Sequence, residues 1–256
     1  MKYAAIILAA GKGTRMNEGL ASPIPKVMFP LNGQPIIDWS VKLIRDAGIE
    51  KIVLIVGYKK EQIENYFRRR PEGSARRVEY AVQTEQLGTG HAVMMAENVL
   101  KDKSDSVIIF YGDNCLYKTE SVKRLIDLYE KEKPTIAILT VKFDDPVFWA
   151  FGRILRDSSG EVIGIREQKD CSEEELKIKE SNPGFYIIDS AWLWKNLKKI
   201  NNQNAQGEYY LTDIIELAKE QGKRIVATPV SEEMEALGIN NPQQLKEAEK
   251  VLKSRS

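Results

Sequence analysis

The feature that most constrains the fold is a series of short apolar runs that alternate with amphipathic stretches over the first two-thirds of the chain. The runs are rich in Ile, Val and Leu, and they predict strands at residues 3–9, 51–56, 78–82, 106–111 and 135–141. Continuous apolar strands are typical of a parallel sheet that is buried on both faces. Strands that alternate with amphipathic helices predict a layered α/β sheet.

The alternation changes after residue 141. Segments 153–156 and 161–168 flank an Asp-Ser-Ser-Gly turn and predict a β-hairpin. Further strands are expected at 184–189 and 224–230. The expected helices cover residues 35–48, 60–67, 90–100, 119–131, 191–199, 211–221 and 242–252. We therefore expect one domain over residues 1–256, with an inserted lobe around residues 143–189.

Composition narrows the class of protein. The chain has 256 residues and a net charge of +1, so its overall charge does not indicate a nucleic-acid partner. Cys115 and Cys171 have no Cys or His at metal-binding spacing, and isolated thiols are typical of a reducing compartment. The apolar run at residues 4–10 is too short for a membrane span, and we interpret it as a buried strand rather than a signal peptide. We expect a cytoplasmic protein that binds no membrane.

A strand that runs into a glycine-containing loop is the strongest local sign of a ligand. The first apolar run is followed by Gly11-Lys12-Gly13, with Arg15 just beyond. Backbone N–H groups and cations in such a loop are suited to phosphate. Met16 stands where a dinucleotide fingerprint needs glycine, and no Gly-Lys-Ser/Thr follows at Walker spacing. The alternative is a tight turn that uses only the conformational freedom of glycine.

Two charged side chains lie in segments that are expected near this loop. Asp113 follows the run at 106–111, and magnesium usually binds one or two carboxylates together with phosphate oxygens and water. Its Gly-Asp-Asn context is equally typical of a plain turn. Lys26 lies beside the rigid residues Pro23 and Pro25, where it could neutralise a phosphoryl group. The alternative for Lys26 is a solvated loop lysine.

Segment 83–91 combines amides with glycines. The amide of Gln83 offers a donor and an acceptor, which can read the edge of a pyrimidine base. Gly88 permits close approach of a flat ring, and the alternative is an ordinary loop whose Thr89 caps the next helix. His91 is the only histidine, and we interpret it as a helix-start residue because one histidine without a partner rarely indicates triad chemistry.

Three later polar residues are weaker candidates. Glu167 and Asn182 could hold sugar hydroxyls or an acetamido group, and Asn240 could give a metal an amide oxygen. The alternatives are a surface strand residue for Glu167, a turn for Asn182 and a helix cap for Asn240.

Taken together, the motifs resemble the sugar-1-phosphate nucleotidyltransferase family. Within it, the chain is similar to the uridylyltransferase domain of the bifunctional enzymes that make UDP-N-acetylglucosamine. The matching motifs are Leu8-Ala9-Ala10-Gly11-Lys12-Gly13-Thr14-Arg15-Met16, Pro25-Lys26-Val27, residues 83–91, Tyr111-Gly112-Asp113, Phe151-Gly152-Arg153-Ile154, residues 204–213 and Gly238-Ile239-Asn240-Asn241. They are specific and cover nearly the whole chain.

This resemblance implies a Rossmann-like nucleotide-diphospho-sugar transferase fold with a mixed, mostly parallel sheet and a hairpin sugar-binding lobe. It implies transfer of a uridylyl group from UTP to a sugar-1-phosphate, N-acetylglucosamine-1-phosphate above all, with Mg²⁺ as cofactor. The implied catalytic residues are Arg15 and Lys26. The implied nucleotide-binding residues are Leu8, Ala9, Ala10, Gly11, Gly13, Gln83, Gly88 and Thr89. The implied sugar-binding residues are Tyr111, Gly152, Glu167 and Asn182, and the implied metal ligands are Asp113 and Asn240.

The chain departs from the family pattern in places. Residues 17–25 look longer than usual, residues 148–151 replace a more polar approach to Gly152, and Pro183 stands where threonine usually follows the asparagine. The β-helical acetyltransferase half has no counterpart here, so we expect no acetyl transfer. The alternatives are a relative that uses glucose-1-phosphate or another nucleotide, and a non-catalytic nucleotide-sugar binding protein.

Overall fold

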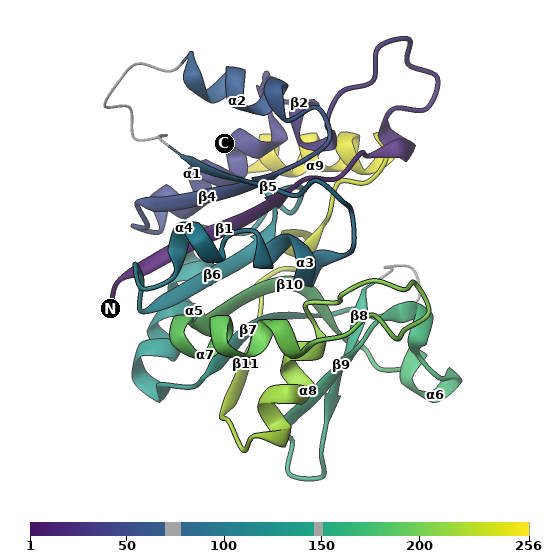
Figure 1. Ribbon diagram of the computed structural model, residues 1–256. Coiled ribbons are helices and arrows are strands. Elements are labelled where there is room, and N and C mark those ends of the chain that lie inside the picture. The colour runs from purple at the N-terminus through teal and green to yellow at the C-terminus, as the bar shows by residue number, and fades with distance from the viewer. Residues whose placement is uncertain (70–77, 146–150, 256) are drawn as a thin grey trace.

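The computed structural model describes residues 1–69, 78–145 and 151–255 (Figure 1). The strands are β1 (Tyr3–Ala9), β2 (Pro30–Leu31), β3 (Gln34–Pro35), β4 (Lys51–Val56), β5 (Glu79–Val82), β6 (Ser106–Tyr111), β7 (Ile136–Lys142), β8 (Gly152–Arg156), β9 (Val162–Arg166), β10 (Glu180–Asp189) and β11 (Ile225–Pro229). The α-helices are α1 (Ile36–Asp46), α2 (Lys60–Arg68), α3 (Thr89–Met94), α4 (Glu97–Leu100), α5 (Thr119–Glu132), α6 (Glu173–Leu176), α7 (Ser190–Asn196), α8 (Asp213–Glu220) and α9 (Pro242–Ser254).

The main sheet has the strand order β11-β7-β10-β6-β1-β4-β5 (Figure 1). Strands β1, β4, β5 and β6 pair in parallel, as do β7 and β11. Strand β10 runs antiparallel to both β6 and β7. The predicted mixed, mostly parallel sheet is therefore confirmed, and β1 lies inside it with its carboxyl end next to that of β6.

Helices cover both faces of this sheet, and the alternation of side chains along β1 shows how (Figure 1). Ala4 and Ile6 are fully buried in a core shared with α3, α4, α7 and α8. Ala5 and Ile7 are also fully buried, in the opposite core, with α1, α2 and α5. A strand buried on both faces needs apolar residues at every position, which is why these strands were readable as continuous apolar runs.

The hairpin lobe joins the main sheet through β10. The first part of β10 pairs with β8, where Asn182 lies opposite Gly152, and β8 in turn pairs with β9. The register of β10 against β7 shifts between Ser181 and Phe185. Gly184 lies inside this irregularity with a φ of 84°. The shift turns β10 from the lobe into the main sheet.

Several predicted elements differ from those observed. The helix expected at 90–100 is interrupted, because the N–H groups of Met95 and Ala96 bond to carbonyls three residues back and end the α-helical pattern. Thr119, which is a plausible cap from its sequence position, does not cap α5, because the helix begins after Lys118 without a side-chain cap. The short elements β2, β3 and α6 were not predicted. Among the described residues, no helix is long and apolar enough to cross a membrane.

Gly184 gives a test of this packing. A Cβ at Gly184 would lie 2.0 Å from Cε2 of the Tyr111 ring, whereas Gly160 has a φ of 83° and open space around it. We expect Gly184→Ala to lower the free energy of unfolding by about 3 kcal/mol or more, because backbone strain and overpacking combine. Gly160→Ala is the matched control, with strain alone and a loss of about 1 kcal/mol. Urea denaturation measures both, and equal losses would contradict the packing described.

Candidate functional site

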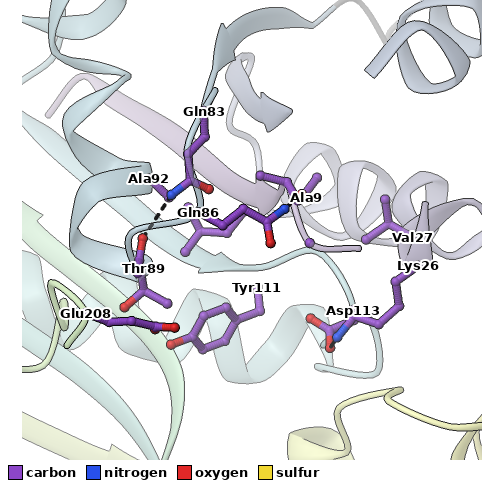
Figure 2. Close-up of a pocket in the computed structure, with 14 residues that line it drawn as sticks. Ala9, Lys26, Val27, Gln83, Gln86, Thr89, Ala92, Tyr111, Asp113 and Glu208 are labelled. Atoms are coloured by element: carbon purple, nitrogen blue, oxygen red, sulfur yellow. Dashed lines mark hydrogen bonds and ion pairs between the residues drawn. The ribbon is translucent and has the colours of Figure 1, made fainter. Parts of the chain in front are cut away.

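A cavity of about 230 Å³ opens at the carboxyl ends of β1 and β6 (Figure 2). Open α/β sheets bind ligands at this edge because the loops that follow parallel strands meet there. The cavity is lined by Leu8, Ala9, Ala10, Gly11, Lys26, Val27, Gln83, Gln86, Gly88, Thr89, Ala92, Tyr111, Asp113 and Glu208. Lys26 and Asp113 lie at one end, and Gln83 and Thr89 lie at the other (Figure 2).

The glycine loop leaves backbone donors free beside this cavity. Within the described residues, the N–H groups of Gly11, Lys12 and Gly13 have no hydrogen-bond acceptor. Gly13 has a φ of 63°, so the positive-φ turn expected for this loop is present. The side chains of Lys12 and Arg15 are exposed, and neither forms an ion pair with any described residue. Free N–H groups and unpaired cations together favour an anionic ligand.

The segment that follows the glycine loop is closed by one side chain. Asn17 donates from Nδ2 to the carbonyls of Lys12, Gly13 and Ile24, at 3.1, 3.0 and 2.8 Å, and its Oδ1 accepts from the N–H of Ile24 at 2.8 Å. Lys59 also donates to the carbonyl of Pro23 at 2.6 Å. These bonds hold the ends of the long segment 17–25 together, so its length does not displace the glycine loop.

Lys26 joins three distant parts of the chain. Its ammonium forms an ion pair with Asp113, and it donates to Oδ1 of Asn240 at 2.8 Å. The side chains of Lys26 and Asp113 are only 18% and 11% exposed, so water screens the pair weakly. A Cβ on Gly13 would lie 2.6 Å from Cβ of Lys26, so only glycine fits beside this lysine.

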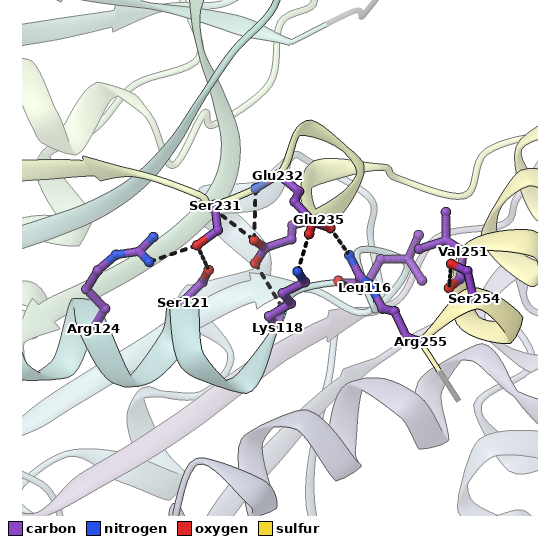
Figure 3. Close-up of polar contacts among 10 residues, drawn as sticks. All are labelled: Leu116, Lys118, Ser121, Arg124, Ser231, Glu232, Glu235, Val251, Ser254 and Arg255. Carbon is purple, nitrogen blue, oxygen red and sulfur yellow. Dashed lines mark hydrogen bonds and ion pairs between the residues drawn. The ribbon is translucent and has the colours of Figure 1, made fainter.

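A buried carboxylate anchors the segment that leads to Asn240 (Figure 3). Glu235 is fully buried and accepts from the backbone N–H groups of Lys118, Ser231 and Glu232, at 2.9, 2.9 and 3.1 Å. Bonds of this kind offset the cost of burying a charge. They fix segment 231–235 beside the start of α5. The N–H of Ile239 then bonds to the carbonyl of Asp113 at 3.2 Å, which brings Asn240 to the cavity mouth.

The oxygen atoms that contact Lys26 are suited to a hard divalent cation. The carboxylate of Asp113 and the amide oxygen of Asn240 converge on one ammonium group, and both are oxygen ligands of the type that Mg²⁺ prefers. No cluster of three or more His, Cys, Asp or Glu residues that could hold a metal occurs in the described ranges. Magnesium sites commonly have only one or two protein ligands and are completed by phosphate oxygens and water.

The other end of the cavity is built around Gln83, which is 6% exposed. Its Nε2 lies 3.0 Å from the carbonyl oxygen of Gly88 and 3.2 Å from Nδ1 of His91. Gln86 donates to the carbonyl of Ala10 at 2.8 Å, which joins this loop to the glycine loop. The amide expected to read a base is therefore held rigidly at the cavity wall.

Segment 208–211 closes the cavity beside this loop. Gly90 donates to the carbonyl of Tyr209 at 2.7 Å, and Tyr209 donates to that of Leu87 at 2.8 Å. A Cβ on Gly88 would lie 2.6 Å from the Tyr209 oxygen, so the approach requires glycine there. The hydroxyl of Thr89 accepts from the N–H of Leu211 at 3.0 Å, so it binds this segment and does not cap α3.

The other residues expected to bind sugar lie on the hairpin lobe, outside this cavity. Asn182 is buried, donates to the Tyr186 hydroxyl at 2.6 Å and accepts from the N–H of Gly184 at 3.1 Å. Glu167 accepts from the Thr212 hydroxyl at 2.9 Å, and burial raises the pKa of its carboxyl. Gly152 lies opposite Asn182, and its added Cβ would be 3.5 Å from Glu167 Oε2. The structure thus brings these three together and leaves Tyr111 as the one expected sugar residue in the first cavity.

Glu167 also lines a second cavity, of about 330 Å³, whose wall is rich in carboxylates. Asp170, Asp213 and Glu216 contribute to it. Burial, followed by the charges of Glu216 and Glu167, raises the pKa of Asp213 to about 6.

Sequence reasoning missed some lining residues. Gln86 and Glu208 both face the cavity and lie inside matching motifs, but the sequence alone did not distinguish them from their neighbours (Figure 2). For Gln86, the available signal is a second side-chain amide three residues after Gln83 in the same glycine-containing segment. Of the departures, residues 148–150 lie outside the described residues, and the carbonyl of Pro183 accepts from Nδ2 of Asn114 at 2.7 Å.

Comparison with known sequences identifies relatives over the whole chain. The family described as nucleotidyl transferase matches residues 4–234. The chain is 43% identical over 255 residues to the bifunctional protein GlmU of Clostridium botulinum, and 43% identical over 251 residues to that of Streptococcus gordonii. These matches cover 100% and 98% of this chain but 53% and 52% of the relatives. The chain therefore spans about half the length of the curated relatives it matches.

Solved structures share the fold. A UDP-glucose pyrophosphorylase in complex with UDP-glucose superposes with a TM-score of 0.81 at 19% identity, covering 100% of both chains. A putative glucose-1-phosphate thymidylyltransferase from Bacillus anthracis superposes with a TM-score of 0.79 at 21% identity, covering 97% of this chain and 94% of that one. The expected nucleotide-diphospho-sugar transferase fold is confirmed.

The acidic cavity predicts a pH effect on stability. The Asp213 carboxyl has a higher pKa in the folded chain, about 6, than its usual value of 3.8, so the folded state favours the protonated form. Stability due to this group is lost as pH rises through that interval. Asp213→Asn should match the wild type near pH 4 and exceed it by about 1–2 kcal/mol near pH 7.5, after allowance for screening. Urea denaturation across this range measures the difference; a pH-independent difference would contradict the assignment.

Proposed function

This chain belongs to the nucleotidyl transferase family, and we propose that it transfers a uridylyl group from UTP to a sugar-1-phosphate and releases pyrophosphate. The proposed acceptor is N-acetylglucosamine-1-phosphate. The observation that carries the proposal is one cavity with free backbone donors along its glycine loop, a fixed amide at one end and the Lys26–Asp113 pair at the other. A base, its phosphates and a cation require this combination.

In the proposed reaction, a phosphate oxygen of the sugar-1-phosphate attacks the α-phosphorus of UTP in line, and pyrophosphate leaves. The free N–H groups of Gly11 and Gly13 would bind phosphate oxygens, and Lys26 and Arg15 would offset their charge. Positioning and charge neutralisation are enough for such a step, and no protein nucleophile is needed. Cys115 would not supply one, because burial raises the pKa of its thiol to about 12.

Asp113 and Asn240 would hold Mg²⁺, which when bound supplies positive charge that reduces the repulsion between the two anionic reactants. Lys26 contacts both of these ligands. It would give up at least one of the two contacts and turn its ammonium towards the substrate phosphates.

The remaining proposed roles rest on the family resemblance and, for the nucleotide, on the lining of the cavity. Gln83, Gly88 and Thr89 would bind the uracil and ribose, together with the backbone of Leu8, Ala9 and Ala10 at the end of β1. Tyr111 would contact the acceptor from the cavity, and Gly152, Glu167 and Asn182 would complete its pocket on the lobe around 143–189. The proposed place of action is the cytoplasm, without nucleic-acid or membrane partners.

A pyrophosphate-release assay with a panel of substrates tests the proposal. The purified chain is mixed with Mg²⁺, each of UTP, TTP, CTP, ATP and GTP, and N-acetylglucosamine-1-phosphate, glucosamine-1-phosphate or glucose-1-phosphate. We expect the highest kcat/KM for UTP with N-acetylglucosamine-1-phosphate. A preference for glucose-1-phosphate would show that the proposed acceptor is wrong. Nucleotide binding without any pyrophosphate release would indicate a binding protein rather than an enzyme.

Asp113→Asn tests the cation site. The substitution keeps the shape of the side chain and removes its charge, so kcat should fall by about 10²-fold or more, the loss typical of one electrostatic contributor. Glu174→Gln is the matched control, because Glu174 lies on α6 with its side chain 83% exposed. Near-normal turnover of the Asp113 variant at saturating Mg²⁺ would refute the metal assignment.

Lys26→Ala tests the phosphate-neutralising cation. We expect kcat to fall by about 10²–10³-fold, because the ammonium is lost at the point where negative charge develops. Circular dichroism should show an intact fold. Lys42→Ala provides the control, since Lys42 is a half-exposed lysine on α1 that pairs only with Asp46 among the described residues. Retained turnover in the Lys26 variant would remove this residue from the mechanism.

A further inference from the structure

We propose that His91 is a positioning residue that sets base selectivity: its Nδ1 fixes the amide of Gln83 so that the oxygen, rather than the nitrogen, faces the cavity. The inference rests on the proposed function, because it takes the ligand at this wall to be a pyrimidine nucleotide. His91 appeared from the sequence to be only a helix-start residue.

The first step is the orientation of the amide. A backbone carbonyl oxygen can only accept a hydrogen bond, so the group of Gln83 that lies 3.0 Å from the Gly88 oxygen is its NH₂ group. The same nitrogen lies 3.2 Å from Nδ1 of His91. Two donors cannot bond to each other, so Nδ1 accepts and the ring proton resides on Nε2.

The second step is the group that remains. With both donors used, Gln83 presents Oε1, which has no hydrogen-bond partner among the described residues. Gln83 is 6% exposed and lines the cavity. A ligand that fills the cavity shields this acceptor from water, so the ligand must offer a donor in its place or leave the acceptor unpaired at a cost. The N3–H group of uracil is such a donor, whereas N3 of cytosine is an acceptor.

The third step is the cost of turning the amide over. A flipped Gln83 could donate to N3 of cytosine, but its Oε1 would then face the Gly88 oxygen, which can only accept, and it could bond to His91 only if the ring proton moved from Nε2 to Nδ1. His91 cannot simply move aside, because it lies in the first turn of α3. There the bond from Gly90 to Tyr209 holds the backbone at 2.7 Å. Gly88 and His91 together therefore oppose the flip.

Substitutions of His91 separate this role from a structural one. His91→Leu removes the acceptor nitrogen and replaces the imidazole with an apolar side chain of similar size. His91→Asn is the matched control, because its amide oxygen can accept near the position of Nδ1. For each protein, kcat/KM is measured with UTP and with CTP at a fixed acceptor concentration, and thermal melting checks the fold.

We expect His91→Leu to lower the ratio of kcat/KM for UTP to that for CTP by about five- to tenfold, the worth of one hydrogen bond. The ratio should stay close to that of the wild type in His91→Asn, and kcat with saturating UTP should change little in both. An unchanged ratio in the Leu variant, or equal losses of selectivity in both variants, would overturn the proposal.

Calorimetric titration with UTP and CTP in Ca²⁺ distinguishes failure of this inference from failure of the proposed function. If the wild type releases no pyrophosphate but binds UTP more tightly than CTP, and only His91→Leu loses that preference, the transferase assignment fails and the positioning role holds. If turnover with UTP is normal and the preference does not depend on residue 91, the positioning role fails and the transferase assignment holds.

Discussion

The contact of one ammonium group with a carboxylate and an amide oxygen organises one end of the cavity. Lys26, in the segment after the glycine loop, contacts Asp113, just after β6, and Asn240, just before α9. Further bonds position Asn240: the buried carboxylate of Glu235 holds segment 231–235 beside the start of α5, and the N–H of Ile239 donates to the carbonyl of Asp113. Because the cluster contains its own cation, the carboxylate of Asp113 and the amide oxygen of Asn240 are held close together in the geometry that the proposed cation site needs.

At the end of the cavity that contains Gln83, neutral groups are likewise held in fixed positions by hydrogen bonds. Gln83 is bound by Gly88 and His91, and segment 208–211 is hydrogen-bonded to the loop that carries them. Fixed amides and backbone groups lose little entropy when a ligand binds. The two ends therefore differ in chemistry, one charged and one neutral, which suits the proposed nucleotide ligand with its anionic phosphates and flat base.

The sequence predicted best what depends on continuous local patterns. The bounds of β1, β4 and β6 were expected residue for residue, because strands buried on both faces are uniformly apolar, and the place of Asp113 followed from the end of β6. Features set by tertiary contacts were not predicted. Glu208 reaches the cavity only because Tyr209 pairs with Leu87, and the break between α3 and α4 leaves no Gly or Pro as a signal.

The closure of segment 17–25 has a practical consequence. Asn17 bonds to Ile24 through both its amide nitrogen and its amide oxygen. The exposed residues between them form a loop whose ends are joined by bonds that do not involve the loop residues. Exposed loops with closed ends tolerate inserted residues. A fluorescent label or short peptide tag inserted at residues 19–21 would lie on a loop joined to the glycine loop, where it could respond to ligands of the proposed site while the glycine loop keeps its shape.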